Sequence, residues 1–526
     1  MAKKFFFPKK SLVYEQDFFV LDLETYSLKA TKNNLWFGCI YSDTQKFYFE
    51  TEEMFYKIIG RLEFNNKIIY AHNGGRFDFL VLFENLLDGD VVYVGSRFIC
   101  FKLKYNGNEI IFGDSLNVIK KGVKEIGTMI NLPKLELKKI GKIKRDAIPS
   151  EKDIEYCFRD CEIVYKGLKK VFGDCPPKLT IGSHSLDDFQ RNYQKHKLVF
   201  NDLIEIQYTK SYYGGRTEAF KLGKGKYLVY DFNSLYTKKM YDAIFPHPSY
   251  SYMIDKPTIR QAERHLMEKE GMLDCKIYVP ENIKYPPLPY IKDGKLCFCH
   301  GYLKGSWTFI EINYALSLGC KLLEVYTIVS SSRLLTGKEF FGDFIDYYYQ
   351  MRLDHDKDSV ENWLGKYKPH NLYGKFGQHN FSSIRYFETM KLCEEFLMGE
   401  ENYYDYTIHD LKTYSKSRKD CYVEKKEKHK LTSHSIISFA AYITAAGRIT
   451  LHQAMTEYNP MYCDTDSLFI PAKNKKQPLT GSGLGELKLE DYEVTYIHGC
   501  KDYKKNIYIY PVSIIKGVGK NSKKIL

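Results

Sequence analysis

The sequence predicts a multidomain protein of the α/β and α+β classes. At 526 residues the chain has room for roughly three domains of ~150 residues each. Two β-type runs near the N-terminus are each followed by acidic residues, and an amphipathic helical pattern comes after them around residues 154–168. A strand–helix unit at residues 227–243 and a hairpin at residues 461–470 carry further carboxylates. Strands and helices therefore occur in both halves of the chain.

The charge and the aromatic content favour a nucleic-acid partner. Lysine and arginine outnumber aspartate and glutamate by 78 to 65, a formal charge of +13, in a chain that also holds 45 tyrosines and 34 phenylalanines. Cations suit a phosphate backbone and aromatic faces suit bases. A generic basic protein shares this composition, so the motifs must decide.

The composition also indicates the compartment. No apolar stretch approaches the ~20 residues of a membrane span, and residues 1–8 are too short for a secretory signal, so we expect a soluble intracellular protein with no membrane partner. Thirteen scattered cysteines favour free thiols in a reducing compartment. The run Cys297-Phe298-Cys299-His300 lacks the second Cys/His pair that zinc-site spacing requires.

The first group of acidic residues lies in the N-terminal third. Asp22 and Glu24 follow the apolar run of residues 18–21 and point to one side of a strand. Asp78 comes at a helix start after a Gly-rich turn, and Tyr156 and Asp160 share a helix face at i and i+4. Singly, these are ordinary strand ends and surface helices.

The second group of acidic residues lies further along the chain. Asp231 ends a strand, and Tyr236 lies one turn into the next helix. Asp464 and Asp466 project from the hairpin tip at residues 461–470. Two like charges held that close are costly unless a divalent cation or a proton relieves them, although a plain polar turn also uses these residue types.

The order of these motifs resembles the three polymerase motifs of family B DNA polymerases: acid-SLY at residues 231–236, Lys-x6-Tyr-Gly at 366–374 and Tyr-x-Asp-Thr-Asp-Ser at 462–467. The N-terminal acids resemble the 3′–5′ proofreading exonuclease of the same enzymes. The first exonuclease acid is already residue 22, and residues 212–215 match a Y-x-G-G signature, so the resemblance narrows to the protein-primed polymerases of small phages, linear plasmids and adenoviruses.

The resemblance implies an RNase H-like exonuclease domain at residues 1–185 and a right-hand polymerase domain at 186–526. The polymerase domain would comprise a ferredoxin-like palm (186–244 and 433–526), a first insertion (245–335), fingers (336–378) and a second insertion (379–432). The insertions would hold a terminal protein and encircle the template, unless they are mere surface excursions. Because only nine residues follow Ile514-Ile515-Lys516-Gly517, which resembles the last palm segment, we expect a short or missing thumb.

The resemblance also implies a role for each site residue. The catalytic carboxylates would be Asp231, Asp464 and Asp466 for synthesis and Asp22, Glu24, Asp78 and Asp160 for the exonuclease, with Tyr156 orienting water. The metal ligands would be Asp231, the carbonyl of Phe232, Asp466 and the four exonuclease acids. The nucleotide contacts would be Tyr236, which excludes a 2′-hydroxyl, Arg352, Lys366 and Tyr373. The DNA contacts would be Thr25, Asn73, Phe77, Ser115, Leu116, Tyr212, Gly214, Gly215, Lys501 and Tyr503, with Asn506-Ile507-Tyr508 as a rival for the last pair.

The implied cofactors are two Mg²⁺ ions per active site, with Mn²⁺ as an alternative. The implied partners of this monomer are template-primer DNA, dNTPs and a terminal protein, in a host cytoplasm for a phage or plasmid, or in a mitochondrion for an organellar plasmid. A catalytic lysine is also expected before the Tyr156 helix, where Lys138, Lys139, Lys142 and Lys144 are equal candidates.

Two departures from the family's motif pattern leave alternative functions open. Thr237 replaces the usual proline after SLY, and His370-Asn371 replaces the usual Asn-Ser, so nucleotide selectivity is in doubt. The alternatives to a DNA polymerase with proofreading are a 3′–5′ exonuclease with a decayed polymerase half, and a non-catalytic relic that binds DNA or a terminal protein. The sequence names neither the terminal protein, the priming nucleotide nor the host.

Overall fold

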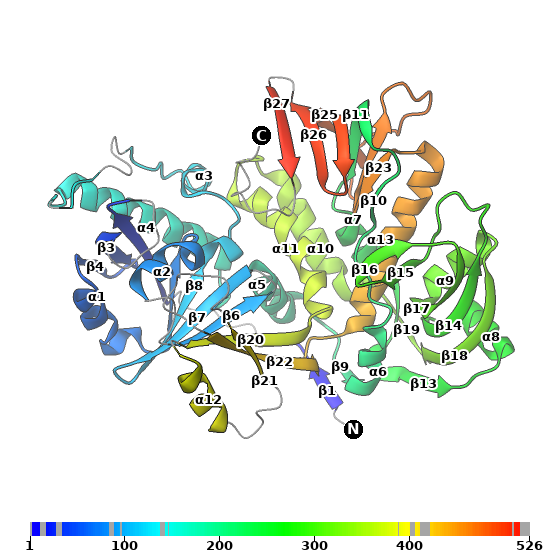
Figure 1. Cartoon of the computed structure of the whole chain (residues 1–526), viewed down its shortest axis with the longest axis horizontal. Coiled ribbons are helices and arrows are strands. Elements are labelled where there is room, and N and C mark those ends of the chain that lie inside the picture. The colour runs from blue at the N-terminus through cyan, green and yellow to red at the C-terminus, as the bar shows by residue number, and fades with distance from the viewer. Residues whose placement is uncertain are drawn as a thin grey trace.

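The computed structural model describes residues 3–10, 17–27, 34–83, 89–94, 97–136, 143–145, 147–387, 389–399, 406–410, 421–507 and 510–515. Figure 1 shows two lobes with a pair of long helices, α10 (Gly337–Asp354) and α11 (Val360–Phe376), between them. Within these ranges, no helix has the length and apolar character needed to cross a bilayer. The predicted last palm segment falls partly outside the described residues, which end at 515.

The N-terminal lobe is built on a ten-stranded sheet with the order β21-β22-β20-β6-β7-β8-β5-β2-β3-β4. Its strands are β2 (Phe18–Thr25), β3 (Leu35–Tyr41), β4 (Lys46–Phe49), β5 (Lys67–Ala71), β6 (Gly89–Val94), β7 (Arg97–Tyr105), β8 (Asn108–Asp114), β20 (His379–Phe387), β21 (Tyr406–Asp410) and β22 (Cys421–Leu431). Because β5 runs parallel to both β2 and β8, the carboxyl ends of these three strands meet at one edge.

Helices cover this sheet and bring further side chains to that edge. They are α1 (Glu52–Ile59), α2 (Asp78–Leu82), α3 (Val123–Met129) and α4 (Glu151–Phe172). A capping box between Ser150 and Asp153 starts α4, and its apolar stripe, which includes Cys157, Cys161 and Leu168, packs on β2 and β3. One end of α4 thereby lies over the acidic end of β2.

The second lobe contains a seven-stranded sheet with the order β10-β23-β24-β11-β25-β26-β27. Its strands are β10 (Thr217–Ala219), β11 (Gly223–Phe232), β23 (Tyr462–Asp464), β24 (Ser467–Pro471), β25 (Leu487–Gly499), β26 (Asp502–Ile507) and β27 (Tyr510–Ile515). Helices α7 (Leu235–Asp242) and α13 (Ile437–Tyr458) contact each other, and α13 also contacts β24. The strand of the first polymerase motif thus pairs with the predicted hairpin, Asp231 facing Ser467.

The predicted first insertion forms a compact unit with its own sheet, ordered β13-β18-β14-β17. Its elements are β13 (Ser251–Asp255), α8 (Ile259–Glu268), β14 (Gly271–Val279), β15 (Pro289–Lys292), β16 (Lys295–Phe298), β17 (Gly301–Thr308), α9 (Phe309–Ser317) and β18 (Lys321–Ser331). The chain enters and leaves through a paired neck, in which β12 (Ile244–Pro246) pairs with β19 (Leu334–Thr336). At the exit a Cβ on Gly337 would lie 2.0 Å from the Met240 carbonyl oxygen, so this close contact requires glycine.

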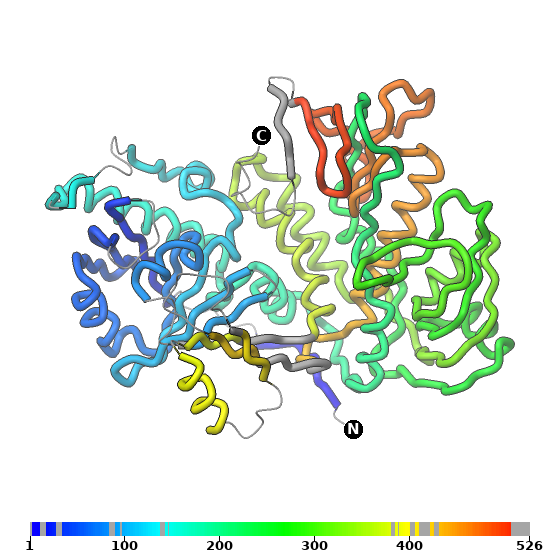
Figure 2. Tube along the Cα trace, in the orientation of Figure 1, coloured from blue at the N-terminus to red at the C-terminus, as the bar shows by residue number. Residues whose placement is uncertain are grey.

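The predicted second insertion joins the sheet of the other lobe. Ser383 and Ile384 of β20 pair with Val92 and Val91 of β6, while α12 (Met390–Met398) packs on β20 and β22. Figure 2 shows this segment, coloured yellow, beside the light-blue N-terminal strands. Sequence spacing gave no sign of this pairing, because β20 and β6 lie far apart along the chain.

The connector between the lobes begins with a helix that runs unbroken through residue 185, the predicted boundary between the exonuclease and the polymerase. It consists of α5 (Ile181–Asp188), a π-helical turn at residues 189–193, β9 (Leu198–Asn201) and α6 (Asp202–Tyr208). Strand β9 pairs with β1 (Lys3–Phe6), and α5 packs against α11.

The carboxylate of Glu205 in α6 binds the first turn of α13, and its raised pKa predicts that the stability of the protein depends on pH. Its side chain is 1% exposed, and its carboxylate accepts hydrogen bonds from the backbone N–H and the hydroxyl of Ser438. Burial nevertheless raises the pKa of Glu205 from 4.5 to about 7. Between these two values the folded protein keeps a proton that the unfolded chain has lost, so the free energy of unfolding falls as pH rises through this window.

A Glu205→Gln variant, whose side chain cannot ionise, should escape this loss. Relative to the wild type, its free energy of unfolding should gain about 2.5 kcal/mol between pH 5 and pH 8, because the pKa of Glu205 is 4.5 in the unfolded chain and about 7 in the folded protein. Urea unfolding at both pH values measures the difference. An equal difference at pH 5 and pH 8 would show that Glu205 does not titrate in this window.

Candidate active sites

The acidic residues of the N-terminal lobe form one cluster, in which Asp78 and Asp160 are buried and Asp22 and Glu24 are half-buried. Asp22 and Glu24 come from β2, Asp78 from the first turn of α2 and Asp160 from α4. Asp78 and Asp160 are 4% and 6% exposed. Carboxylate oxygens of Asp22 and Glu24 lie within 4.8 Å of each other and of Cys157 Sγ. The edge of the sheet and one helix thus bring together residues that are far apart in sequence.

The electrostatics of this cluster favour a cation. Burial is the largest cause that raises the pKa of Asp22, and repulsion from Asp160, Glu24 and Asp78 adds to it. Burial, with repulsion from Asp160 and Asp78, raises the pKa of Glu24 to about 7, and burial raises the pKa of Asp78 to about 7. Within the described part of the chain, Asp160 Oδ1 is buried without a hydrogen-bond partner. Buried carboxylates that repel one another and retain a bare oxygen fit divalent metal ions.

A lysine that the sequence analysis did not single out completes the cluster. Lys134 Nζ donates to Asp160 Oδ2 and lies 4.8 Å from the centre of the Tyr156 ring. Burial alone lowers the pKa of Lys134, but its hydrogen bonds to Asp160 and Tyr156 outweigh that effect and keep it charged. Of the four lysines considered from the sequence, Lys144 is exposed, and Lys138, Lys139 and Lys142 lie outside the described residues. One lysine in a lysine-rich stretch carries no local signal of such a contact.

The residues expected to contact a DNA end differ in how far they are exposed beside this cluster. Asn73 has a left-handed backbone (φ 66°), and its N–H donates to Asp114 Oδ1. Thr25 and Phe77 are partly exposed beside the acids. Ser115 is only 1% exposed and its hydroxyl lies 2.9 Å from His72 Nδ1, so it faces the interior. Leu116 stays partly exposed.

The acids of the second lobe meet where β11 ends and the hairpin turns. The N–H of Phe232 donates to the carbonyl of Asp466, which holds Asp231 beside the hairpin tip. Thr465 between the two hairpin acids has φ 63°, and its N–H donates to the carbonyl of Arg216. Burial, then repulsion from Asp466, raises the pKa of Asp231 to about 7. Asp231 and Asp466 are thus a second pair of mutually repelling carboxylates.

Asp464 has a different environment from its neighbour. Its Oδ1 accepts hydrogen bonds from Thr217, from Thr465 and from Lys501 Nζ, all at 3.0–3.1 Å. With 7% exposure and a lysine in contact, Asp464 is already compensated. The arrangement suits a supporting role behind Asp231 and Asp466.

Cations from the two long helices and from β25 lie near these acids. Arg352 in α10 lies 3.4 Å from Ser234 Oγ, and Lys488 Nζ on β25 is 3.9 Å from Asp231 Oδ1. Desolvation by the surrounding protein, with repulsion from Arg352 and Lys488, lowers the pKa of Lys366. Lys488 also pairs with Glu490 at 2.7 Å, and neither residue of this pair was singled out from the sequence.

Two tyrosines stack beside the acids. The rings of Tyr236 and Tyr373 are 5.0 Å apart at 26°, and Tyr236 is 4% exposed. A Cβ on Gly215 would lie 2.8 Å from both Tyr236 Oη and Thr465 Cγ2. Gly215 therefore permits contact with the hairpin of the same chain, whereas Gly214 has open space around it.

The loop at residues 212–215 is anchored by a buried ion pair that sequence reasoning missed. Arg448 of α13 donates to the carbonyls of Tyr213 and Gly214, and it pairs with Glu311 of α9 at 2.7 Å. Both charged side chains are at most 3% exposed. The Tyr212 ring lies against Gly377 at the end of α11. The loop thus contacts the first insertion, α13 and α11 together.

Two predicted DNA contacts, Lys501 just before β26 and Tyr503 within it, differ in exposure. Lys501 is exposed and reaches Asp464. Tyr503 is 3% exposed, and its ring packs edge-on against Phe469 at 4.9 Å. Tyr503 therefore offers little surface to DNA in this structure and supports the strand that carries Lys501.

Comparisons with known proteins agree with this geometry. A family model described as "DNA polymerase type B, organellar and viral" matches residues 134–461. The DNA-directed DNA polymerase of Enterobacteria phage PRD1 is 25% identical over 441 residues, covering 80% of this chain and 70% of its own length. The DNA polymerase of Bacillus phage M2 is 26% identical over 306 residues, covering 53% of this chain and 51% of its own.

The fold resembles a solved structure over almost its whole length. Phi29 DNA polymerase complexed with primer-template DNA and incoming nucleotide substrates aligns with a TM-score of 0.71 at 18% identity, covering 96% of this chain and 93% of the other. At this identity the likeness concerns the fold.

Proposed function

The chain belongs to the organellar and viral DNA polymerases of type B, and on that premise we propose that it extends DNA from dNTPs and removes 3′ ends in a separate exonuclease site. One observation carries the proposal. Asp231 and Asp466 converge at the end of the seven-stranded sheet, and the cations Lys366 and Arg352 face them from the two long helices. Acids opposite cations are what phosphoryl transfer between a hydroxyl and a triphosphate requires.

In the synthetic site, each group has a task. Asp231, Asp466 and the carbonyl of Phe232 would hold two Mg²⁺ ions, whose chemistry is to acidify the primer hydroxyl and neutralise the triphosphate. Lys366 and Arg352 would bind the β- and γ-phosphates, and their charges would stabilise the leaving pyrophosphate. Tyr236, packed under Tyr373, would exclude a 2′-hydroxyl from the nucleotide pocket.

In the exonuclease site, Asp22, Glu24, Asp78 and Asp160 would hold the metal ions of a two-metal hydrolysis. Lys134 and Tyr156 form one hydrogen-bonded unit with Asp160. The ammonium of Lys134 would stabilise negative charge that develops on the scissile phosphate, while the Tyr156 hydroxyl would orient the attacking water.

A Lys134→Met variant should therefore lose about 100-fold in 3′–5′ degradation of single-stranded DNA, the usual cost of one preorganised donor. Primer extension should stay unchanged, because Lys134 lies in the other lobe. Lys144→Met is the matched control, since that lysine is exposed in the same stretch. Equal rates for both variants in a gel-based degradation assay would remove Lys134 from the mechanism.

We further propose that the first nucleotide is attached to a terminal protein, on a linear viral, plasmid or organellar DNA. Two features support this. The insertion at residues 245–335 folds as its own unit on a paired neck, and the Arg448–Glu311 pair ties it to the loop at residues 212–215. We also propose that residues 1–185 form the exonuclease and residues 186–526 the polymerase, because the two groups of acids lie on two separate sheets.

Primer extension tests the central proposal. The protein is mixed with a 5′-labelled primer, a longer template, Mg²⁺ and all four dNTPs, and the products are separated by length. We expect extension with dNTPs and shortening of the primer without them. Shortening under both conditions would instead indicate an exonuclease with an inactive polymerase half, and DNA binding without turnover would indicate a non-catalytic protein.

A further inference from the structure

A buried ion pair joins the two long helices to the connector between the lobes. Lys368 of α11, Asp188 at the end of α5 and Tyr348 of α10 are each at most 5% exposed. Lys368 Nζ lies 2.7 Å from Asp188 Oδ2 and 2.7 Å from the Tyr348 hydroxyl, which itself donates to Asp188. Three elements that are distant in sequence therefore meet at one carboxylate.

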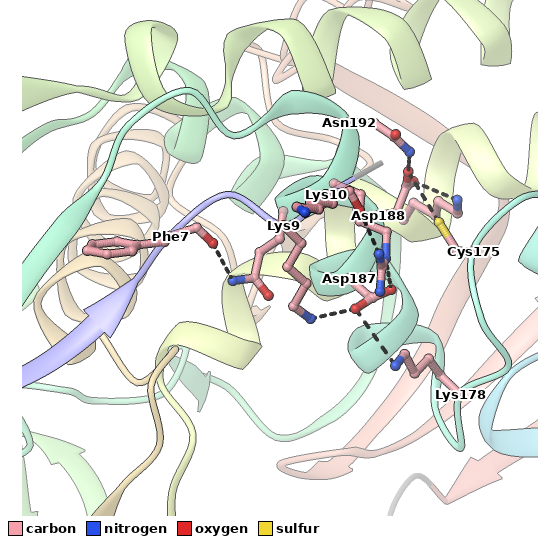
Figure 3. Close-up of polar contacts among 11 residues, drawn as sticks. Phe7, Lys9, Lys10, Cys175, Lys178, Asp187, Asp188 and Asn192 are labelled. Atoms are coloured by element: carbon pink, nitrogen blue, oxygen red, sulfur yellow. Dashed lines mark hydrogen bonds and ion pairs between the residues drawn. The ribbon is translucent and has the colours of Figure 1, made fainter. Parts of the chain in front are cut away.

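The connector side of this contact is held in place by further polar contacts. Asn192 donates to Asp188 Oδ1 at 2.8 Å, and the neighbouring Asp187 pairs with Lys9 and Arg191. Figure 3 shows Asp187 turned toward Lys9 and Lys178, and Asp188 turned toward Cys175 and Asn192. Burial alone raises the pKa of Asp188, but Lys368 lowers it below its ordinary value, so the buried carboxyl is ionised.

Such a pair contributes more to geometry than to stability. A buried ion pair often gives no more stability than well-packed apolar groups of the same size, because desolvation offsets the attraction, whereas its directional bonds specify one arrangement. Here the arrangement is also tight. A Cβ on Gly365 would lie 2.5 Å from the Tyr348 carbonyl oxygen and 2.6 Å from Arg352 Cβ, so α10 and α11 pack as closely as their backbones allow at this point.

Lys368 and Tyr348 of this contact lie on the same two helices as the cations of the synthetic site. Tyr348 and Arg352 are at i and i+4 of α10 and share a face. Lys366 precedes Lys368 by two residues in α11. A displacement of either helix relative to α5 would therefore move Arg352 or Lys366.

We propose that Lys368, Asp188 and Tyr348 are positioning residues that fix α10 and α11 on the connector and thereby set the places of Arg352 and Lys366 for the triphosphate. The inference rests on the proposed function. It predicts that the affinity for dNTPs, rather than the exonuclease, depends on this buried contact.

The test compares Lys368→Met, Asp188→Asn and the double variant with the wild type. Lys195→Met is the matched control. Lys195 lies in the same connector and also pairs with α10, through Asp343 at 2.5 Å, but this pair is exposed to solvent.

We expect KM for dNTP to rise about tenfold in both single variants, with degradation of single-stranded DNA unchanged. In the double variant the melting temperature should recover, since no buried charge is left unpaired, while KM stays high. The control should match the wild type.

Two results would overturn the inference. One is a KM that returns to the wild-type value together with the melting temperature in the double variant, which would indicate a purely structural pair. The other is an unchanged KM in all variants. If the wild type extends no primer, the proposed function fails and KM cannot be measured. Amide hydrogen exchange of residues 337–376 then tests whether the ion pair fixes α10 and α11 on the connector. Faster exchange in the double variant than in the control supports the contact, and equal exchange rejects it.

Discussion

Replacing Asp466 with alanine is expected to reduce primer extension by at least about 1000-fold, because the metal ions of the synthetic site would lose one of their two carboxylates. Degradation of single-stranded DNA should stay within about twofold of the wild type, since its acids lie in the other lobe. Both rates are measured on the same protein preparation with a labelled oligonucleotide, with and without dNTPs.

Asp491→Ala is the matched control for this variant. Asp491 is exposed on β25, next to Glu490, and removal of its charge should leave both rates unchanged. Asp464→Asn should be milder than Asp466→Ala, because the amide still accepts a hydrogen bond from Thr217 and Lys501. Loss of both activities in Asp466→Ala, with circular dichroism unchanged, would contradict two separate sites.

The reverse phenotype is expected when Asp22 and Glu24 are both replaced by alanine. Degradation of single-stranded DNA should fall by at least about 1000-fold, because half of the carboxylates that would hold metal ions are removed, while synthesis persists. Products copied with an unbalanced dNTP supply should then contain more mismatches. Asp17→Ala is the matched control, since Asp17 lies next to the other end of β2, is more than half exposed and pairs with Lys67.

The same double variant gives a second readout that needs no activity. Burial and repulsion raise the pKa of Asp22 and Glu24, so these carboxylates cost stability when no cation is present. In EDTA the variant should melt at a higher temperature than the wild type at pH 8. Mg²⁺ should raise the melting temperature of the wild type more than that of the variant. Identical responses to Mg²⁺ would show that these acids hold no metal.

Local patterns predicted many strands and helices and the pairs of side chains that project together, whereas the grouping of these pairs into two sites came from the family resemblance. Asp22 with Glu24, and Asp464 with Asp466, lie at i and i+2 of strand or hairpin segments, and this spacing by itself places two side chains on one side. Tyr156 and Asp160 share a helix face for the same kind of reason. The predicted fold class is confirmed by the match to a solved polymerase over 96% of the chain. The domain boundaries, the individual site roles and the terminal protein stay predictions.

The sequence by itself determined what short-range stereochemistry controls. This includes which residues form strands and helices, where these elements end, and which carboxylates project from the same side of an element. The tertiary structure alone decided which distant partner each charged group meets. Lys134 on Asp160, Arg448 on Glu311 and Lys368 on Asp188 join segments 26, 137 and 180 residues apart. In a chain with 78 lysines and arginines, residue type marks none of them as special. Their roles arise because burial removes water as an alternative partner, and only the packed fold determines which charges are buried together.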